Sequence, residues 1–305
     1  MQENSFSDAN RRRCFWDGAL GLWYWSKCMR VIPYALSDVG QKRAHNEDNY
    51  LVAEDLGLFA VADGMGGHQA GEMASRLAVE KLRGFLRAQD PNATPSERLL
   101  FLTDAMMRVG AEIFDAAQAD PALEGMGTTL TSLWVKGRRA YIGHVGDSRA
   151  YLFRDGRVQQ LTFDHSWVAE QVRAGFLTEK EARESRFRHI ITRSVGFERD
   201  VQVDSAMLPI HVGDCLLLCS DGLSNFLDEM DLNEVLGRQL YRDVPKVLVG
   251  LANARGGDDN ITAVLIHVAN DSGPEGQLTL PAPGIQEDDS RPNPSVEPSP
   301  DSSPE

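Results

Sequence analysis

Short apolar runs bounded by glycine, aspartate and asparagine recur along the middle of this chain. Apolar runs of this length between turn-forming residues are typical of β-strands. They cover residues 58–62, 130–135, 140–145, 150–153, 215–219 and 261–268. Two links, residues 137–139 and 154–157, have the glycine and charged residues of hairpin turns. The pattern therefore predicts strands paired in antiparallel sheets.

Helical periodicity is confined to two long stretches and a later pair of short ones. Apolar residues repeat at intervals of three and four from Ala70 to Leu86 and from Pro95 to Ala119. Residues 228–254 supply two more short helices. Strands joined by hairpins, with helices inserted in blocks, predict an α+β fold of antiparallel sheets covered by helices, not a doubly wound βαβ fold.

Composition places the chain among ordinary globular proteins and argues against nucleic acid as a partner. Of its 305 residues, 42% are hydrophobic and 25% charged. The net charge is −14, from 45 acidic and 31 basic residues, so no general electrostatic footprint for nucleic acid is present. The same excess of carboxylates suits hard metal ions.

The charge and the prolines divide the chain into three parts. Residues 270–305 hold eight acidic residues, one arginine and eight of the 14 prolines, which predicts a disordered tail with a net charge of −7. Residues 1–30 carry a net +2 and form an N-terminal extension of unknown role. Residues 31–269 remain as one working domain with a net charge of −9.

Cysteine usage and the N-terminal segment bear on the compartment. Four cysteines in a chain this long do not make a disulfide scaffold, and Cys215 and Cys219 would lie roughly 13 Å apart on one strand. Cys14 and Cys28 could pair only in an oxidising compartment. The apolar segment 15–25 is too short to span a bilayer. We interpret it as a packed or interfacial extension, with a mis-assigned start or a membrane-surface anchor as alternatives, and expect a cytoplasmic protein.

Five acidic turns lie next to apolar runs: four adjoin strands predicted above, and the fifth precedes Tyr50-Leu51-Val52. They are Asn46-Glu47-Asp48-Asn49, Asp63-Gly64, Gly146-Asp147-Ser148, Ser220-Asp221-Gly222 and Asp258-Asp259-Asn260. Carboxylates gathered at one sheet edge repel each other unless a multivalent cation neutralises them. No Cys/His pair with zinc spacing lies nearby, so an oxygen-only ligand set favours Mg²⁺ or Mn²⁺. Any single turn of this kind is also explained by turn propensity alone.

Other phosphate chemistries fit the sequence less well. A cysteine phosphatase needs Cys and Arg six positions apart, but Asn225 occupies that position after Cys219. The glycine-rich Gly64-Met65-Gly66-Gly67 lacks the Lys-Ser/Thr of a P-loop. Gly146-Asp147-Ser148-Arg149-Ala150 lacks the last glycine of a nucleophile elbow.

Eight short motifs, in order, resemble those of bacterial PP2C-type (PPM) protein serine/threonine phosphatases. They are Ser37-Asp38-Val39-Gly40 with Arg43, Asn46, Glu47 and Asp48; Val61-Ala62-Asp63-Gly64-Met65-Gly66-Gly67-His68; Gly127-Thr128-Thr129; Gly146-Asp147-Ser148-Arg149; Leu161-Thr162-Phe163-Asp164-His165-Ser166; Ile191-Thr192-Arg193; Ser220-Asp221-Gly222; and Asp259-Asn260. The resemblance spans about residues 35–268. It implies a four-layer α-β-β-α sandwich of two antiparallel sheets flanked by helices.

The resemblance also implies a two-metal centre holding Mn²⁺ or Mg²⁺. Asp63 would contact both ions, and Asp48, Asp221, Asp259 and the carbonyl of Gly64 would complete their ligands. In this family, a water between the ions attacks the phosphorus in line. Asp147, with Asp221, would hold a weaker third ion, and Arg43 would bind the substrate phosphate.

Other roles implied by the resemblance are less specific. His68 would protonate the leaving serine or threonine oxygen or hydrogen-bond near the site, whereas His165 is expected to be structural. Residues 166–190 correspond to the family's flap, whose Arg183, Arg186 and Arg188 would face an acidic substrate or simply solvent. A metal-dependent binding module and a hydrolase of small phosphoesters stay open as alternatives.

The partners implied are phosphorylated serine/threonine proteins, including a cognate kinase whose action the chain reverses. Neither nucleic acid nor membrane insertion is expected, and the domain is expected to be a monomer.

Overall fold

The computed structural model describes residues 15–17, 22–24, 29–67 and 69–270. Strands β1 (Phe15–Asp17) and β2 (Leu22–Tyr24) pair with each other as a separate two-stranded sheet. The predicted disordered tail beyond residue 270, most of the N-terminal extension, Cys14 and Cys28 lie outside the described residues. Strand β3 begins at Met29 and pairs with Asn270, so the sheet includes residues just beyond both expected domain limits.

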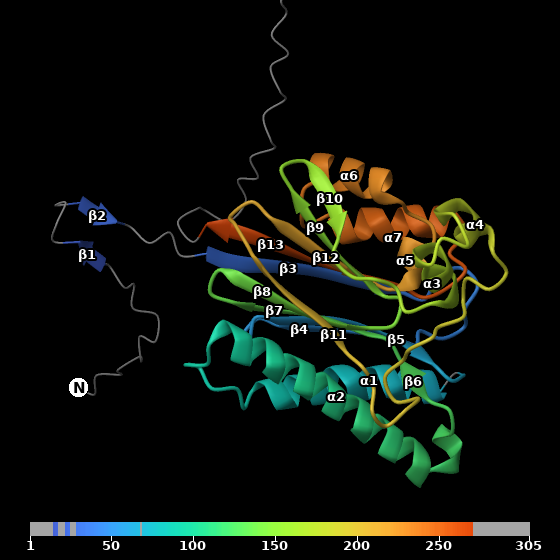
Figure 1. The fold of residues 1–305 in the computed structure, drawn as a ribbon. Coiled ribbons are helices and arrows are strands. Elements are labelled where there is room, and N and C mark those ends of the chain that lie inside the picture. The colour runs from blue at the N-terminus through green and yellow to red at the C-terminus, as the bar shows by residue number, and fades with distance from the viewer. Residues whose placement is uncertain (1–14, 18–21, 25–28, 68, 271–305) are drawn as a thin grey trace, which may run out of the picture.

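Two antiparallel sheets form the centre of the molecule (Figure 1). The first contains, in spatial order, β10 (Arg157–Gln160), β9 (Arg149–Arg154), β12 (Cys215–Cys219), β13 (Ile261–Asn270) and β3 (Met29–Asp38). The second contains β11 (Asp204–Pro209), β8 (Arg139–Val145), β7 (Leu130–Lys136), β5 (Leu58–Met65) and β4 (Asp48–Ala53), and β6 (Gly127–Thr128) pairs with the end of β5. All six strands predicted from apolar runs are present, and both predicted hairpins join neighbouring strands.

Helices cover the outer face of each sheet, which completes the α-β-β-α sandwich (Figure 1). The second sheet packs against α1 (Gln69–Leu86) and α2 (Pro95–Ala119), and the first against α6 (Glu229–Arg238) and α7 (Val244–Ala254). The shorter elements are the 3₁₀ turn η1 (Pro121–Leu123), α3 (Trp167–Arg173), α4 (Glu179–Glu184) and α5 (Asp221–Ser224). The expected fold class is confirmed.

The alternation of side chains along the strands explains why the sandwich needs four layers. On β12, Leu217 faces the helices of its own sheet, whereas Leu216 and Leu218 face the other sheet. On β5, Ala60 packs towards α1 and Phe59 packs between the sheets. Strands that are apolar on both faces require cover on both sides.

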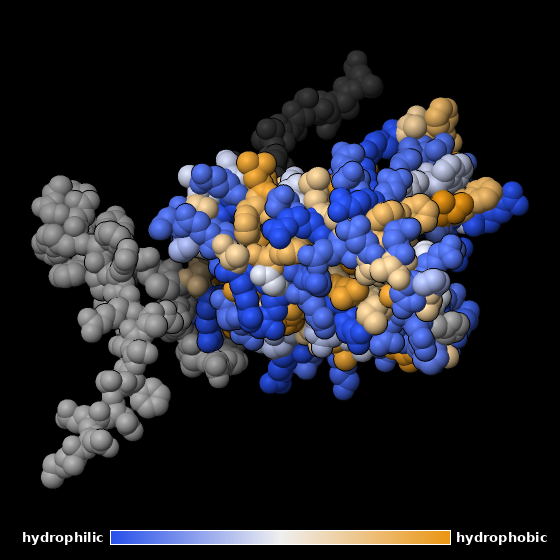
Figure 2. Space-filling model, turned by 90° about the horizontal axis from the view of Figure 1, so that it is seen from below, coloured by the Kyte–Doolittle hydropathy of each residue, from blue (hydrophilic) through white to orange (hydrophobic). Residues whose placement is uncertain are grey.

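Helix α2 shows how local sequence sets the limits of an element. Thr94 caps its first turn and forms a capping box with Glu97, while Pro95 occupies a position where its missing N–H costs no hydrogen bond. Its buried residues include Leu102, Met106 and others at intervals of three and four, as the sequence predicts. On the surface formed by α1 and α2, hydrophilic side chains prevail, with hydrophobic residues in small groups between them (Figure 2).

Strand ends place the acidic turns at one end of the sandwich. Asp48 opens β4 directly opposite Asp63 on β5. Asp147 and Asp221 each lie two residues after a strand, β8 and β12, and Asp259 lies two residues before β13. The β7–β8 and β9–β10 hairpin turns lie at the opposite ends of their strands. Among the described residues, no helix has the length and apolar character needed to cross a bilayer.

Candidate metal centre and active site

Hydroxyl groups from the first sheet fix the Asp48 carboxylate. Ser220 Oγ and Thr262 Oγ1 both donate to Asp48 Oδ2, at 2.7 and 2.6 Å. A chain of donors continues behind Thr262, since Asn46 Nδ2 donates to Ser37 Oγ, which contacts Thr262 Oγ1 at 2.8 Å. Asp48 Oδ1 is buried without a hydrogen-bond partner. One oxygen is thus held in place and the other remains available as a ligand.

The loop around Asp63 is held by the Gly127-Thr128-Thr129 motif. The Asp63 N–H donates to Thr129 Oγ1 at 2.9 Å, and Thr128 Oγ1 donates to the Asp63 carbonyl at 2.9 Å. Gly64 is required sterically, because a Cβ there would lie 2.2 Å from the Gly71 carbonyl oxygen. These contacts fix the backbone at the position where the family resemblance expects a carbonyl ligand.

Asp147 and Asp221 each present one unpaired buried oxygen. Their Oδ1 atoms have no hydrogen-bond partner, and Asp147 is only 7% exposed. Asp221 Oδ2 accepts from Asn225 Nδ2 at 3.1 Å. With Asp48 Oδ1, these atoms make three buried carboxylate oxygens without a hydrogen-bond partner, all near strand ends at one end of the sheets.

The carboxylates are electrostatically coupled. Burial first, and then the neighbouring carboxylates, raise the pKa of Asp63 well above its ordinary range. The pKa of Asp48 rises to about 7, mainly through burial, and burial likewise raises the pKa values of Asp147 and Asp221. Divalent cations would relieve this unfavourable concentration of negative charge, so the residues fit a metal centre.

Asp259 and Arg43 form an ion pair at the edge of this cluster. Arg43 Nη2 donates to Asp259 Oδ2 at 2.7 Å, and the Arg43 side chain is half exposed. Among the described His, Cys, Asp and Glu side chains, no group of three or more is already positioned around one ion. Like-charge repulsion and the Arg43 contact both oppose such a closed arrangement.

Several predicted residues lie elsewhere or outside the described part of the chain. His68 lies outside the described residues. His165 accepts from the Gly146 N–H through Nδ1 and contacts Asp204 Oδ2 through Nε2 at 3.2 Å, which agrees with the expected structural role. Within residues 166–190, the segment expected to be a flap, Arg183 pairs with Glu179 and Arg186 stacks on Phe187.

Sequence reasoning assigned no role to the polar residues that support the acidic turns. Ser220, Thr262 and Asn260 are buried, and Asn260 accepts from the Glu47 N–H at 2.8 Å. The sequence signal that could have identified them is a hydroxyl residue inside an apolar strand, such as Thr262. His189 was also missed; it is exposed, yet its charge partly opposes the rise that burial causes in the pKa of Asp221.

Comparisons with known protein sequences show the family to which the chain is similar. Residues 40–254 match the family model described as Protein phosphatase 2C. The chain is 38% identical over 234 residues to the serine/threonine phosphatase stp of Listeria innocua, covering 75% of this chain and 93% of that protein. It is also 38% identical over 266 residues to PstP of Mycobacterium tuberculosis, covering 82% of this chain and 50% of PstP.

Solved structures give the same result. The serine/threonine phosphatase of S. agalactiae superposes with a TM-score of 0.73 at 36% identity, covering 78% of this chain and 99% of that one. The catalytic domain of PstP, solved with two manganese ions, superposes with a TM-score of 0.71 at 36% identity. The match covers 79% of this chain and 100% of that one. The protein is a bacterial serine/threonine protein phosphatase that depends on Mn²⁺ or Mg²⁺. By the extent of these matches, the chain belongs to the protein phosphatase 2C family.

Proposed function

We propose that the acidic cluster is the catalytic centre and that Asp63 is a ligand of both core ions. Asp48, Asp221, Asp259 and the Gly64 carbonyl complete the ligand set. The observation that supports this assignment is the set of buried, unpartnered oxygens on Asp48, Asp147 and Asp221. When bound, two divalent cations supply the positive charge that acidifies an attacking water and neutralises the phosphoryl oxygens.

Arg43 binds the substrate phosphate in this proposal. Its guanidinium is at the mouth of the site and half exposed, and its present partner is a carboxylate that also serves as a ligand. A phosphate presents two oxygens to the planar guanidinium fork, which gives a bidentate contact that a lysine cannot make. Substrate binding and metal binding are then coupled through the exchange of Arg43 between Asp259 and phosphate.

Asp147 holds a weaker third ion together with Asp221. The pKa of Asp147 is raised first by burial and then by Asp221, which places these two carboxylates in one electrostatic environment. Arg149, anchored on Asp164 by two hydrogen bonds of 2.9 and 2.7 Å, opposes that shift. Asp164 raises the same pKa and so acts against Arg149. In this proposal two carboxylates hold the third ion, whereas four carboxylates and the Gly64 carbonyl hold the core pair, so the third ion binds less tightly.

His68 protonates the departing serine or threonine oxygen, which is a poor leaving group without a proton. The test compares two substrates. Replacing His68 with Asn should reduce kcat strongly on a phosphopeptide and weakly on an aryl phosphate, whose phenolate leaves unaided. Equal losses on both substrates would assign His68 to hydrogen bonding near the site.

The substrates are phosphoproteins, among them a cognate serine/threonine kinase, and the enzyme acts as a cytoplasmic monomer. The relatives' names as serine/threonine phosphatases support the substrate class. The deciding experiment is a Mn²⁺ titration with a phosphopeptide and a small aryl phosphate, followed by EDTA. We expect metal-dependent turnover with a higher kcat/KM on the phosphopeptide. A higher kcat/KM on the small aryl phosphate would favour the alternative of a hydrolase of small phosphoesters. Metal binding without turnover would favour the alternative of a metal-dependent binding module.

A further inference from the structure

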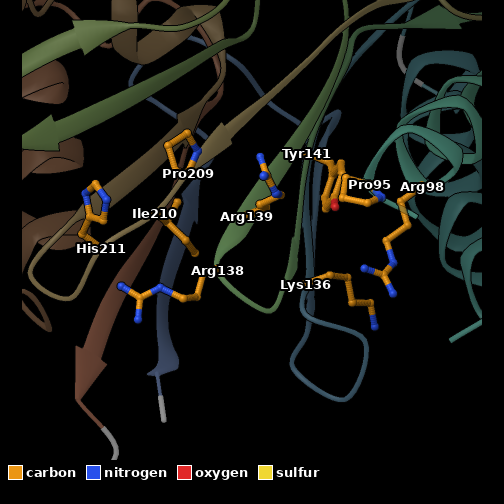
Figure 3. Close-up of a pocket in the computed structure, with 9 residues that line it drawn as sticks. All are labelled: Pro95, Arg98, Lys136, Arg138, Arg139, Tyr141, Pro209, Ile210 and His211. Atoms are coloured by element: carbon orange, nitrogen blue, oxygen red, sulfur yellow. The ribbon is translucent and has the colours of Figure 1, made fainter. Parts of the chain in front are cut away.

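A basic pocket lies around the β7–β8 turn, at the end of the sandwich opposite the acidic cluster. Figure 3 shows the residues that line this pocket. It has a volume of about 310 Å³ and is lined by Arg98, Lys136, Arg138, Arg139 and His211, among others. The residues lining it include no Asp or Glu. Strand β8 begins with Arg139 in this pocket and ends just before Asp147, which separates the two sites by roughly 20 Å at strand geometry.

The cations that line the pocket form no ion pair with a carboxylate of the described residues. Lys136, Arg138 and Arg139 form no ion pair with a carboxylate in the part of the chain that the structure describes, and Arg98 Nη2 donates to the Pro91 carbonyl instead. Arg98 Nε is buried without a partner. Burial and the charge of Arg98 lower the pKa of Lys136, against a smaller opposing effect of Asp55. The first turn of α2, which contributes Arg98, adds the positive end of a helix dipole.

The chain leaves the described domain beside this pocket. Strand β13 ends at Asn270, and Val268 exchanges backbone hydrogen bonds with Gly213 and Asp214 at 2.8 and 2.9 Å. The turn containing those residues begins at His211, which lines the pocket. Figure 1 shows the end of β13 and the β7–β8 turn at the same end of the sandwich.

We propose that the acidic tail, residues 271–305, binds in the basic pocket of its own chain. The tail carries eight acidic residues and one arginine, and Glu287-Asp288-Asp289 is its densest acidic run. A flexible chain of the 17 residues from Asn270 to Glu287 would reach roughly 23 Å, which is enough for this run to return to the exit point. Tethering raises its effective concentration to about the millimolar range.

Binding of the tail has a consequence for the phosphatase site. A free chain with a net charge of −7 would repel acidic phosphoproteins over about one Debye length. Held in the pocket, that charge stays at the far end of the molecule from Asp63 and is partly neutralised. An acidic partner could then reach the pocket only by displacing the tail.

Carbodiimide coupling of the full chain tests the proposal, because it joins a carboxylate to an amine only when the two touch. We expect Lys136 to be the main amine coupled to Glu287, Asp288 or Asp289 within one chain at low ionic strength. Lys81, an exposed lysine paired with Glu112, is the internal comparison. Raising the salt to about 0.5 M should reduce the Lys136 product several-fold, since screening weakens ion pairs near the surface.

Two charge-matched variants provide the control. Arg138→Glu with Arg139→Glu should reduce the Lys136 product at least about fivefold, because like charges then face the tail. The double variant with Arg157→Glu and Arg242→Glu changes the net charge by the same amount, but at exposed sites outside the pocket. It should leave the amount of the Lys136 product unchanged. Turnover of an aryl phosphate verifies that both variants fold. Coupling spread evenly over the lysines, insensitivity to the pocket variant, or a product formed only between two chains would each overturn the proposal.

Discussion

Arg43 Nη2 lies 2.7 Å from Asp259 Oδ2, so the residue expected to bind phosphate is paired with a residue expected to bind metal. One position earlier in each loop, Lys42 pairs with Asp258 at 2.6 Å. The two neighbouring ion pairs have the same charges, but the second is more exposed and only the first borders the acidic cluster. The second pair is therefore a built-in control for the function of the first.

Replacing Arg43 with Ala should raise KM for a phosphopeptide by roughly 10- to 100-fold, which corresponds to the loss of one charge-assisted phosphate contact. Arg43→Lys should restore little of this loss, because an ammonium cannot reproduce the planar fork. Lys42→Ala is the control and should leave KM unchanged. Steady-state kinetics at saturating Mn²⁺ measure all three, and an unchanged KM in Arg43→Ala would remove Arg43 from the site.

Replacing Asp63 or Asp221 with Asn should reduce kcat at least ~10²-fold, because water activation depends on the ions. The same change should raise the melting temperature in EDTA, since a neutral amide removes the cost of burying a charge and then the repulsion between carboxylates, the two causes that raise the pKa values of both carboxyls. Asp104→Asn, on an exposed face of α2, should change neither quantity. A melting temperature lowered in EDTA would show that these carboxylates stabilise the metal-free fold.

Asp147→Ala should leave two tightly bound ions and abolish a weaker third one. Turnover on protein substrates should fall while the fold is kept. Calorimetric titration with Mn²⁺ counts the sites directly. Loss of all metal binding would instead assign Asp147 to the primary pair.

Thr262→Val and Ser220→Ala should each weaken Mn²⁺ binding by about 10- to 100-fold, because Asp48 loses a hydrogen bond that orients it. Thr103→Val is the matched control, since the Thr103 hydroxyl bonds only within α2, to the Leu99 carbonyl. Calorimetric Mn²⁺ affinities compare the three variants with the parent. Unchanged affinity in both test variants would show that Asp48 needs no such support.

His144 should make the fold less stable in acid. Burial, and then the neighbouring His165, lower the pKa of His144 from 6.5 to about 4. Its Nε2–H donates to the Phe163 carbonyl at 2.8 Å, and its Nδ1 contacts Thr131 Oγ1 at 2.9 Å. Between pH 6.5 and 4 the unfolded chain binds a proton that the folded chain does not, so stability is complete above pH 6.5 and decreases below it.

The free energy of unfolding should decrease by at most about 3 kcal/mol between pH 7 and pH 4 because of His144. Urea unfolding across this range, with EDTA present throughout, measures it. His144→Gln should show a correspondingly smaller pH dependence than the parent protein. Identical pH dependence in the two proteins would contradict the assignment.

The local elements were largely predictable from the sequence. Helix α2 has the limits Pro95–Ala119 that periodicity and its N-terminal proline indicate, and β12 spans the predicted residues 215–219. These elements follow from short-range physics, because side-chain alternation, capping and turn propensity depend on neighbours within a few residues. The acidic turns were recognisable for the same reason, since each directly adjoins an apolar strand.

Only the tertiary structure decided which of these turns come together and what holds them. Asp48 receives its hydrogen bonds from Ser220 and Thr262, which are 172 and 214 residues away in the chain. The raised pKa values follow from burial, and burial depends on the closing of two sheets over a common core. The basic pocket likewise combines the start of α2, the β7–β8 turn and the end of β11. Such groupings depend on the packing of distant segments, which no local pattern of residues records.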